Sequence, residues 1–135
     1  MRTLAEILRE ARTIAMVGAS PKPDRPSHGV MRYLLAQGYD VIPVRPAGCD
    51  EVLGVPCVRT LAEIDRPIDI VDVFRRAEFT PEVARETVAV GAGALWLQLG
   101  VVSAESRRIA EEAGLEYVED ACTAVVHRFE IRETA

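Results

Sequence analysis

The segment VGASPKPDRPS, which begins at residue 17, contains residue types suited to binding phosphate. Gly18 ends an apolar run, and the small Ala19 and Ser20 after it let backbone N–H groups approach a phosphate closely. Lys22 and Arg25 follow and can donate charge-assisted hydrogen bonds to further phosphate oxygens. A helix expected just after the segment would add the partial positive charge of its N-terminus. The segment therefore predicts an anion site.

Two common nucleotide motifs do not fit this segment. The NAD fingerprint G-x-G-x-x-G needs three spaced glycines and an acidic residue after the second strand, whereas this chain has one glycine and Arg45 there. An arginine at that place suits an additional phosphate, as in NADP or in the 3′-phosphate of coenzyme A. The phosphate loop G-x-x-x-x-G-K-[ST] does not occur in the chain.

Other candidate residues follow apolar runs that are expected to be parallel strands. Ligands bind at the carboxyl ends of such strands, and basic residues follow three of the five runs although the net charge is −5. The alternative for these arginines is a solvated rim paired with nearby acids. Trp96 lies within an apolar run, which favours the core. The other candidate ligand-binding residues are Ser27, Arg45, Pro46, Phe74, Arg75, Gln98 and Gly100.

Three residues near the C-terminus suggest a catalytic alternative. Cys122 could act as a nucleophile with His127 as its base and Asp120 as the orienting acid, which would suit thioester chemistry. Such partners meet in space, so their closeness in sequence proves nothing. Histidines are more often ordinary surface or capping residues, and the sequence favours a binding protein without catalysis of its own.

Strand and helix patterns alternate along the chain. Near-continuous apolar runs predict strands covered on both faces, as in a parallel sheet. This order predicts an α/β, Rossmann-like three-layer α/β/α fold with a mainly parallel sheet of five or six strands. The expected strands are residues 13–17, 40–44, 69–74, 94–97 and 115–118. The expected helices are residues 28–37, 81–90 and 104–113.

Start and stop signals bound these helices. We expect Ser27, Thr80 with Pro81, and Ser103 to open them, and Gly38, Gly91 and Gly114 to end them. The hexapeptide RTLAEI occurs at 2–7 and again at 59–64. Thr-x-x-Glu is a capping box, so each copy predicts a short helix rather than an internal repeat. The segment 48–59 predicts a loop with a small extended excursion.

Composition limits the function classes. A length of 135 residues predicts a single domain spanning 1–135. The net charge of −5 argues against a general binder of nucleic acid or of anionic membranes. The chain contains no apolar run of the ~18 residues that a membrane span requires. Its first residues do not resemble a signal peptide, so a cytoplasmic location is expected.

Cysteine and arginine usage give two further expectations. Cys49, Cys57 and Cys122 form no C-x-x-C pair and leave one cysteine over from any disulfide scheme. We therefore expect small, partly buried thiols rather than a zinc site or a disulfide framework. All basic residues except Lys22 are arginines, which suggests a GC-rich, thermophilic source.

The segments quoted above resemble a known family. VGASPKPDRPSHGVMRYLLAQGYDVIPVRP, DIVDVFRR, ALWLQLGV and EDAC occur in the order and spacing of small stand-alone CoA-binding proteins. Their domain is similar to the nucleotide-binding domain of the succinyl-CoA synthetase α subunit. The resemblance covers roughly residues 10–128 and is more specific than a single glycine turn.

The resemblance implies a Rossmann-like domain that holds coenzyme A or an acyl-CoA. It implies that the loop from Gly18 to Lys22 binds the phosphates and that Arg45 and Pro46 lie near the adenosine. Family members usually carry Asn or Ser where Arg45 stands, and many carry Asp-Arg-Cys where this chain has Asp120-Ala121-Cys122.

Three functions remain open from the sequence. The first is a carrier, regulatory or partner-dependent module that binds coenzyme A. The second is a small acyl-CoA-processing enzyme that uses Cys122, and the third is an NADP-dependent oxidoreductase. An exposed sheet edge in so small a domain also favours a homodimer.

Overall fold

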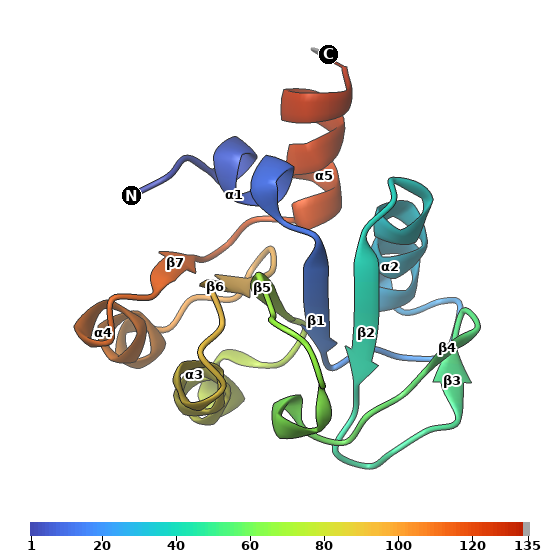
Figure 1. Cartoon of the computed structure of the whole chain (residues 1–135), viewed down its shortest axis with the longest axis horizontal. Helices are drawn as coiled ribbons and strands as arrows, with labels where there is room; N and C mark the ends of the chain where they lie inside the picture. The colour runs from blue at the N-terminus through green and yellow to red at the C-terminus, as the bar shows by residue number, and fades with distance from the viewer. Residues whose placement is uncertain (134–135) are drawn as a thin grey trace.

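Five short, mostly apolar runs form one parallel sheet (Figure 1). The computed structural model describes residues 1–133. The strands lie in the order β2-β1-β5-β6-β7, and all neighbouring pairs are parallel. Their bounds are β1 (Thr13–Val17), β2 (Asp40–Val44), β5 (Ile70–Val73), β6 (Ala94–Leu97) and β7 (Glu116–Val118). The α/β, Rossmann-like prediction is confirmed.

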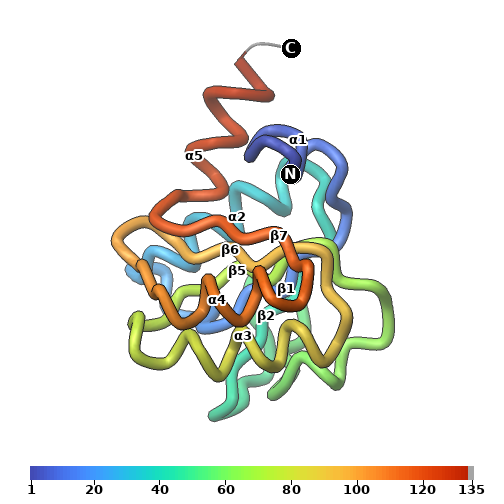
Figure 2. The backbone as a smooth tube through the Cα atoms, turned by 90° about the vertical axis from the view of Figure 1, so that its left-hand side faces the viewer, coloured from blue at the N-terminus to red at the C-terminus, as the bar shows by residue number. Residues whose placement is uncertain are grey.

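Helices cover both faces of this sheet, which gives three layers (Figure 2). One layer consists of α1 (Leu4–Glu10), α2 (Pro26–Ala36) and α5 (Thr123–His127), with the π-helical turn η3 (Arg128–Arg132) continuing α5. The other layer consists of α3 (Thr80–Ala89) and α4 (Ala104–Glu112), with the short turns η1 (Leu61–Glu63) and η2 (Ala77–Phe79). The helices at the two ends of the chain, α1 and α5, pack against each other.

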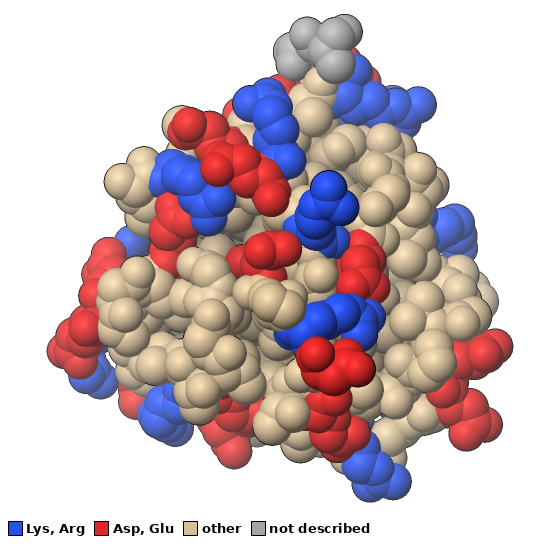
Figure 3. All heavy atoms as spheres, in the orientation of Figure 1, with Lys and Arg blue, Asp and Glu red and all other residues tan. Residues whose placement is uncertain are grey.

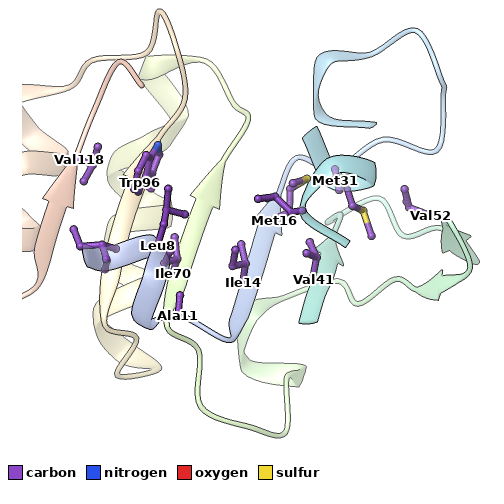
Figure 4. Packing of buried hydrophobic residues seen from close by; sticks show 14 residues of the cluster. Leu8, Ala11, Ile14, Met16, Met31, Val41, Val52, Ile70, Trp96 and Val118 are labelled. Atoms are coloured by element: carbon purple, nitrogen blue, oxygen red, sulfur yellow. The ribbon is translucent and has the colours of Figure 1, made fainter. Parts of the chain in front are cut away.

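Alternating side chains of the strands build a separate core on each face. Ile14 and Met16 of β1 point toward the layer of α1, α2 and α5, while Ala15 and Val17 point toward the other layer. Figure 4 shows the first of these cores, where side chains of β1, β2, β5, β6 and β7 meet Leu8 and Met31. Each fully buried aliphatic side chain contributes about 1.5–3 kcal/mol to stability.

The strand order places a topological switch at β1. From β1 the chain crosses through α2 to β2 on one side of the sheet, whereas β5, β6 and β7 follow one another on the other side. Helix α2, which follows β1, and helix α3, which follows β5, therefore cover opposite faces of the sheet. Such a reversal opens a crevice at the carboxyl ends of the strands, where open α/β sheets bind their ligands.

The helix boundaries largely match their sequence signals. Ser103 caps α4 by accepting a hydrogen bond from the N–H of Ser106. The three glycines expected to end helices all have positive φ, as a left-handed C-terminal residue requires. The prediction that Ser27 caps α2 is wrong, because the helix begins at Pro26 with Arg25 at the N-cap and no side-chain cap. Proline at the first helical position fixes φ for the helix, so α2 starts earlier than expected.

The two copies of the hexapeptide fold differently. Thr3 and Glu6 form the predicted capping box and open α1. Thr60 makes no side-chain cap, and the second copy forms only the 3-10 turn η1, so the prediction of a capped helix there is wrong. Pro67 restricts the residue before it to extended conformations, which prevents a helix from continuing past Ile64.

The segment after β2, predicted as a loop with a small extended excursion, forms a small hairpin. Strands β3 (Glu51–Val52) and β4 (Val55–Pro56) are antiparallel and joined by a two-residue turn. Leu53 and Gly54 both have positive φ, as the tight hairpin turn that fits strand twist demands.

A disulfide joins Cys49 and Cys57 across the base of this hairpin, with Cα atoms 5.6 Å apart. The expectation of three free thiols is therefore wrong for these two residues and right for Cys122. The pairing of β3 with β4 brings the two cysteines close together at the base of the hairpin, which their spacing in the sequence did not indicate.

Candidate functional site

A cavity of about 700 Å³ lies at the carboxyl ends of the strands, where the switch in strand order predicts a site. Every element around the switch contributes to its wall: the ends of β1, β2, β5 and β6, and the N-terminal turns of α2 and α5. The lining residues are Gly18, Ser20, Pro21, Lys22, Arg25, Pro26, Ser27, Val30, Arg45, Phe74, Arg75, Gln98, Leu99, Val101, Cys122 and Val125.

Gly18 is the turn that opens this cavity. Its φ is +85°, and its N–H donates to the carbonyl oxygen of Val44 at 3.0 Å. A Cβ atom at this position would overlap the backbone carbonyl oxygen of Phe74. Only glycine therefore fits between the ends of β2 and β5, and its small size keeps the backbone of β1 accessible from the cavity.

Two serines hold the loop after Gly18 in place. The N–H of Ser20 donates to the Oγ of Ser27 at 3.1 Å, and the N–H of Lys22 donates to the Oγ of Ser20 at 3.1 Å. Ser27 thus fastens the loop to the first turn of α2 instead of capping that helix. These bonds place the side chains of Lys22 and Arg25 at the cavity.

Four cations line the cavity without acidic partners. Within residues 1–133, Lys22, Arg25, Arg45 and Arg75 form no ion pair, whereas Arg76, next in sequence, pairs with Glu78. The alternative of arginines paired with nearby acids is therefore wrong for Arg25, Arg45 and Arg75 and right for Arg76. A cluster of unpaired cations on a protein of net charge −5 favours an anionic ligand.

Arg45 is held with part of its guanidinium unsatisfied. Its Nη1 donates to the carbonyl oxygen of Ala19 at 3.0 Å, so the arginine also buttresses the loop. Among the buried side-chain nitrogen and oxygen atoms of the described chain, only Nε of Arg45 has no hydrogen-bond partner. An unpaired buried donor costs about 1–3 kcal/mol, and a ligand oxygen or a water that reached it would remove that cost.

Three buried polar residues are hydrogen-bonded to one another next to the cavity. The carboxylate of Asp72, at the centre of β5, accepts hydrogen bonds from Gln98 Nε2 and from Thr123 Oγ1. All three side chains are buried, and only Gln98 reaches the cavity wall. Burial raises the pKa of Asp72 to about 7, although the two hydrogen bonds act in the opposite direction.

Most of the predicted ligand-binding residues meet in this cavity, but three do not line it. Ala19 is fully buried behind the loop, and Pro46 lies beyond the end of β2. Gly100 has a φ of +84° and donates its N–H to Asp120 Oδ1 at 2.7 Å, so it shapes the turn after β6.

Apart from Phe74, the sequence did not indicate the apolar part of the wall. Val30 lies one turn after the start of α2, and its position could have been found from helical periodicity. Leu99 and Val125 are largely exposed and face the cavity from the turn after β6 and from α5. No helix was predicted at 123–127, so the sequence did not indicate that Val125 lines the cavity.

The three candidate catalytic residues are not assembled as a triad. Cys122 lines the cavity, but Asp120 is hydrogen-bonded to the backbone of Gly100. His127 pairs through Nδ1 with the hydroxyl of Tyr33 at 3.0 Å, and burial lowers the pKa of this histidine. Neither residue is bonded to Cys122 in the described chain.

The described residues limit two further classes of site. No group of three or more His, Cys, Asp or Glu residues in this part of the chain could hold a metal ion. None of the helices within residues 1–133 is long and apolar enough to cross a membrane.

Two small proteins illustrate what this chain is similar to. An uncharacterized protein of Bacillus subtilis, YneT, is 45% identical over 124 residues, which cover 92% of this chain and 91% of that protein. A hypothetical protein from Pyrococcus horikoshii has a solved structure with a TM-score of 0.89 and 40% identity, covering 93% of this chain and 87% of that one.

A larger enzyme contains the same fold. The dinucleotide-forming acetyl-coenzyme A synthetase 1 of Ca. Korarchaeum cryptofilum has a TM-score of 0.74 at 21% identity, covering 87% of this chain but only 27% of the enzyme. The model of the CoA binding domain family matches residues 12–128, which include every residue of the cavity. The chain therefore belongs to the family of CoA binding domains.

Proposed function

We propose that this protein binds coenzyme A in the cavity at the carboxyl ends of its strands. The observation that supports this best is the cluster of four unpaired cations around one cavity on an otherwise acidic protein. Coenzyme A carries three phosphate groups, more anionic charge than a simple nucleoside monophosphate presents. The match to the CoA binding domain family points to the same ligand.

The residues of the cavity fit the parts of this cofactor. Gly18, Ser20 and Lys22 would hold phosphate oxygens, aided by the first turn of α2. Arg45 and Arg75 would reach further phosphate oxygens, and the unpaired Nε of Arg45 is a donor that such a ligand could satisfy. Phe74, Leu99 and Val125 would line the uncharged arm of coenzyme A, whose thiol gives acyl groups an attachment point.

Titration calorimetry with coenzyme A tests the proposal, with dephospho-coenzyme A and NADP as parallel ligands. We expect micromolar binding of coenzyme A, weaker binding without the 3′-phosphate, and no heat with NADP. Tight binding of NADP and none of coenzyme A would instead support a reductase.

Neighbouring arginines provide a matched pair of variants. Arg75→Ala should weaken coenzyme A binding about 10- to 100-fold, because it removes charge-assisted hydrogen bonds. Arg76→Ala removes a charge of the same sign one residue away, but Arg76 is exposed, pairs with Glu78 and does not line the cavity. Equal losses in the two variants would contradict specific binding at this cavity and indicate a general charge effect.

The proposal extends to the role of the protein. We infer a carrier, regulatory or partner-dependent module for coenzyme A or an acyl-CoA, acting without catalysis of its own. A homodimer would form through β7, the edge strand at the opposite end of the sheet from β2. A protein that binds coenzyme A must meet it inside the cell, so a cytoplasmic location belongs to the same proposal.

Cys122 supports one alternative, a small acyl-CoA-processing enzyme, because its free thiol lines the cavity. Release of free thiol from acetyl-CoA by the wild-type protein, lost in Cys122→Ser, would favour that alternative. We expect no release above the buffer rate.

A further inference from the structure

Asp72 is a buried acid beneath the cavity that the proposed binding residues do not include. It lies between Val71 and Val73 at the centre of β5 and is fully buried. Its neighbours in register are Met16 of β1 and Trp96 of β6. A carboxyl group among apolar side chains is costly unless it is well hydrogen-bonded, so its presence here calls for a physical reason.

The hydrogen bonds around Asp72 fix the orientation of one side chain of the cavity wall. Gln98 Nε2 donates to Asp72 Oδ1 and, at 3.2 Å, to Thr123 Oγ1. Thr123 Oγ1 in turn donates to Asp72 Oδ2 at 2.9 Å. An ionised carboxylate can only accept hydrogen bonds, so the amide nitrogen of Gln98 must be the atom that faces inward.

The carbonyl oxygen of Gln98 is therefore the atom left for the cavity. Within residues 1–133, Gln98 Oε1 accepts no hydrogen bond, and it is not among the buried side-chain atoms without partners. It must then contact solvent, and Gln98 lines the cavity. A carbonyl oxygen in that place attracts a hydrogen-bond donor and repels a phosphate oxygen.

We propose that Asp72 is a positioning residue that holds Gln98 with its carbonyl oxygen toward the cavity, where this oxygen accepts a hydrogen bond from an amide N–H of the ligand's arm. This inference rests on the proposed binding of coenzyme A, whose pantetheine arm contains two amide groups. The apolar Leu99, Val101 and Val125 line the same cavity as Gln98 and suit an uncharged arm rather than phosphate. By orienting Gln98, Asp72 thereby favours binding of the uncharged arm of the cofactor, while the cations favour binding of its phosphates.

Protonation of Asp72 would loosen this arrangement. A neutral carboxyl group can donate to a carbonyl oxygen, so Gln98 could turn its amide and present N–H groups to the cavity. The pKa of Asp72 is raised to about 7 by burial, which places this change near neutral pH.

Other titratable and charged groups surround the same site. Cys122 and His127 lie on α5 or at its start, and Arg45 and Arg75 follow β2 and β5. None of them forms an ion pair with Asp72 in the described chain. Because the ligand prefers the ionised form, coenzyme A should bind most tightly above the pKa of Asp72 and more weakly as the pH falls through it.

The test compares coenzyme A with adenosine 3′,5′-bisphosphate, a fragment that carries the 3′-phosphate but lacks the arm. Both are titrated calorimetrically into the wild type, Asp72→Leu, Asp72→Asn and Gln98→Met at about pH 6 and about pH 8. At the higher pH, Asp72→Leu and Gln98→Met should weaken coenzyme A about tenfold, the effect of one lost hydrogen bond, and leave the fragment unchanged.

Asp72→Asn reproduces the neutral side chain without a titration. Its amide can accept from Gln98 Nε2 or, like a protonated carboxyl, donate to Gln98 Oε1, so relative to the fragment, coenzyme A should bind this variant at the higher pH about as weakly as it binds the wild type at the lower pH. Relative to the fragment, the wild type should lose affinity at the lower pH and Asp72→Asn should not. Comparison with the fragment corrects for the effect of pH on the 3′-phosphate, which both ligands carry.

Several outcomes would overturn the inference. Unchanged coenzyme A affinity in both Asp72→Leu and Gln98→Met would do so, as would an equal loss for the fragment, which a merely structural role predicts. If Asp72→Leu does not fold, as judged by circular dichroism, Gln98→Met and the pH profile of the wild type decide. Wild-type protein that binds the fragment but not coenzyme A would refute this inference and the proposed function together.

Discussion

Two glycines of one segment show how a single residue can control the site. Gly18 has a φ of +85° and leaves no room for a Cβ atom beside Phe74. Gly29 lies inside α2, where a Cβ atom would meet nothing within 4 Å. The same substitution should therefore have opposite effects at the two positions.

Gly18→Ala should lower the free energy of unfolding by at least about 2 kcal/mol, because it adds a steric overlap to an unfavourable backbone conformation. Gly29→Ala should raise it by about 0.5–1 kcal/mol, the usual gain of alanine over glycine within a helix. Urea unfolding of both variants measures these changes. A stable Gly18→Ala variant that binds coenzyme A normally would contradict the role of this turn.

Asp72 should make the stability of the protein depend on pH. Its folded pKa of about 7 exceeds the unfolded value of 3.8, so the folded state binds a proton more tightly. The stabilisation from this proton is fully present below the unfolded pKa and is lost as the pH rises through the folded one, by up to about 4 kcal/mol.

Asp72→Asn removes this titration. We expect Tm to rise in the variant relative to the wild type at about pH 8 and to rise much less at about pH 5, since the wild-type carboxyl is largely neutral at the lower pH. Differential scanning calorimetry at the two pH values measures both differences. The same increase at both would show that burial of a charge at Asp72 does not limit stability.

At the scale of elements, β3 and β4 form a separate two-stranded hairpin that is attached to the main sheet through the residues after it. The Cys49–Cys57 disulfide closes its base, and a parallel bridge between Val44 and Val58 attaches the following residues to β2. The N–H of Arg45 donates to the carbonyl oxygen of Val58, so this attachment reaches the residue that enters the cavity. The hairpin itself contributes no residue to the cavity wall.

Cys57→Ser should therefore lower stability without changing ligand binding. Losing a cross-link that closes so short a loop should cost about 2–3 kcal/mol of unfolding free energy. Coenzyme A affinity should stay within about twofold of the wild type, because the bonds from Val58 and Val44 remain. Cys122→Ser is the control for a lost sulfur atom, and it should change stability much less. A large loss of affinity in Cys57→Ser would show that the hairpin positions Arg45.

At the scale of the whole molecule, charge is distributed unevenly. Figure 3 shows one face, on which basic and acidic side chains lie interspersed. Many arginines of the described chain form ion pairs, as Arg66 does with Asp40 and Arg107 with Glu119. The cations of the cavity are unpaired, so a small anionic ligand meets local positive charge despite the net charge of −5.

Coenzyme A binding should therefore weaken as salt is added. Raising NaCl from about 50 mM to about 500 mM shortens the screening length from about 14 Å to about 4 Å, and we expect at least a tenfold loss of affinity. Calorimetry across this series measures the slope. Arg75→Ala should show a smaller slope than the wild type, and Arg76→Ala should keep the wild-type slope. Affinity independent of salt would place the binding energy in apolar contacts.

Local signals predicted most of the fold. Three strands begin and end where the sequence placed them, because near-continuous apolar runs have few other structures in a small α/β protein. The short helix at 123–127 was missed because its five residues are too few to show a period. The first copy of RTLAEI formed its cap and the second did not, although the six residues are identical, so the difference depends on residues outside the motif.

The sequence by itself determined the strand–helix order, the turn at Gly18 and the basic residues that follow the strands. These depend on residue type and short spacing, which act locally. Only the tertiary structure decided that Cys49 pairs with Cys57, that Ser27 fastens a loop rather than capping a helix, and that Asp72 lies beneath Gln98. Each of these contacts joins residues whose distance in space depends on how helices and strands pack, and local sequence does not encode that distance.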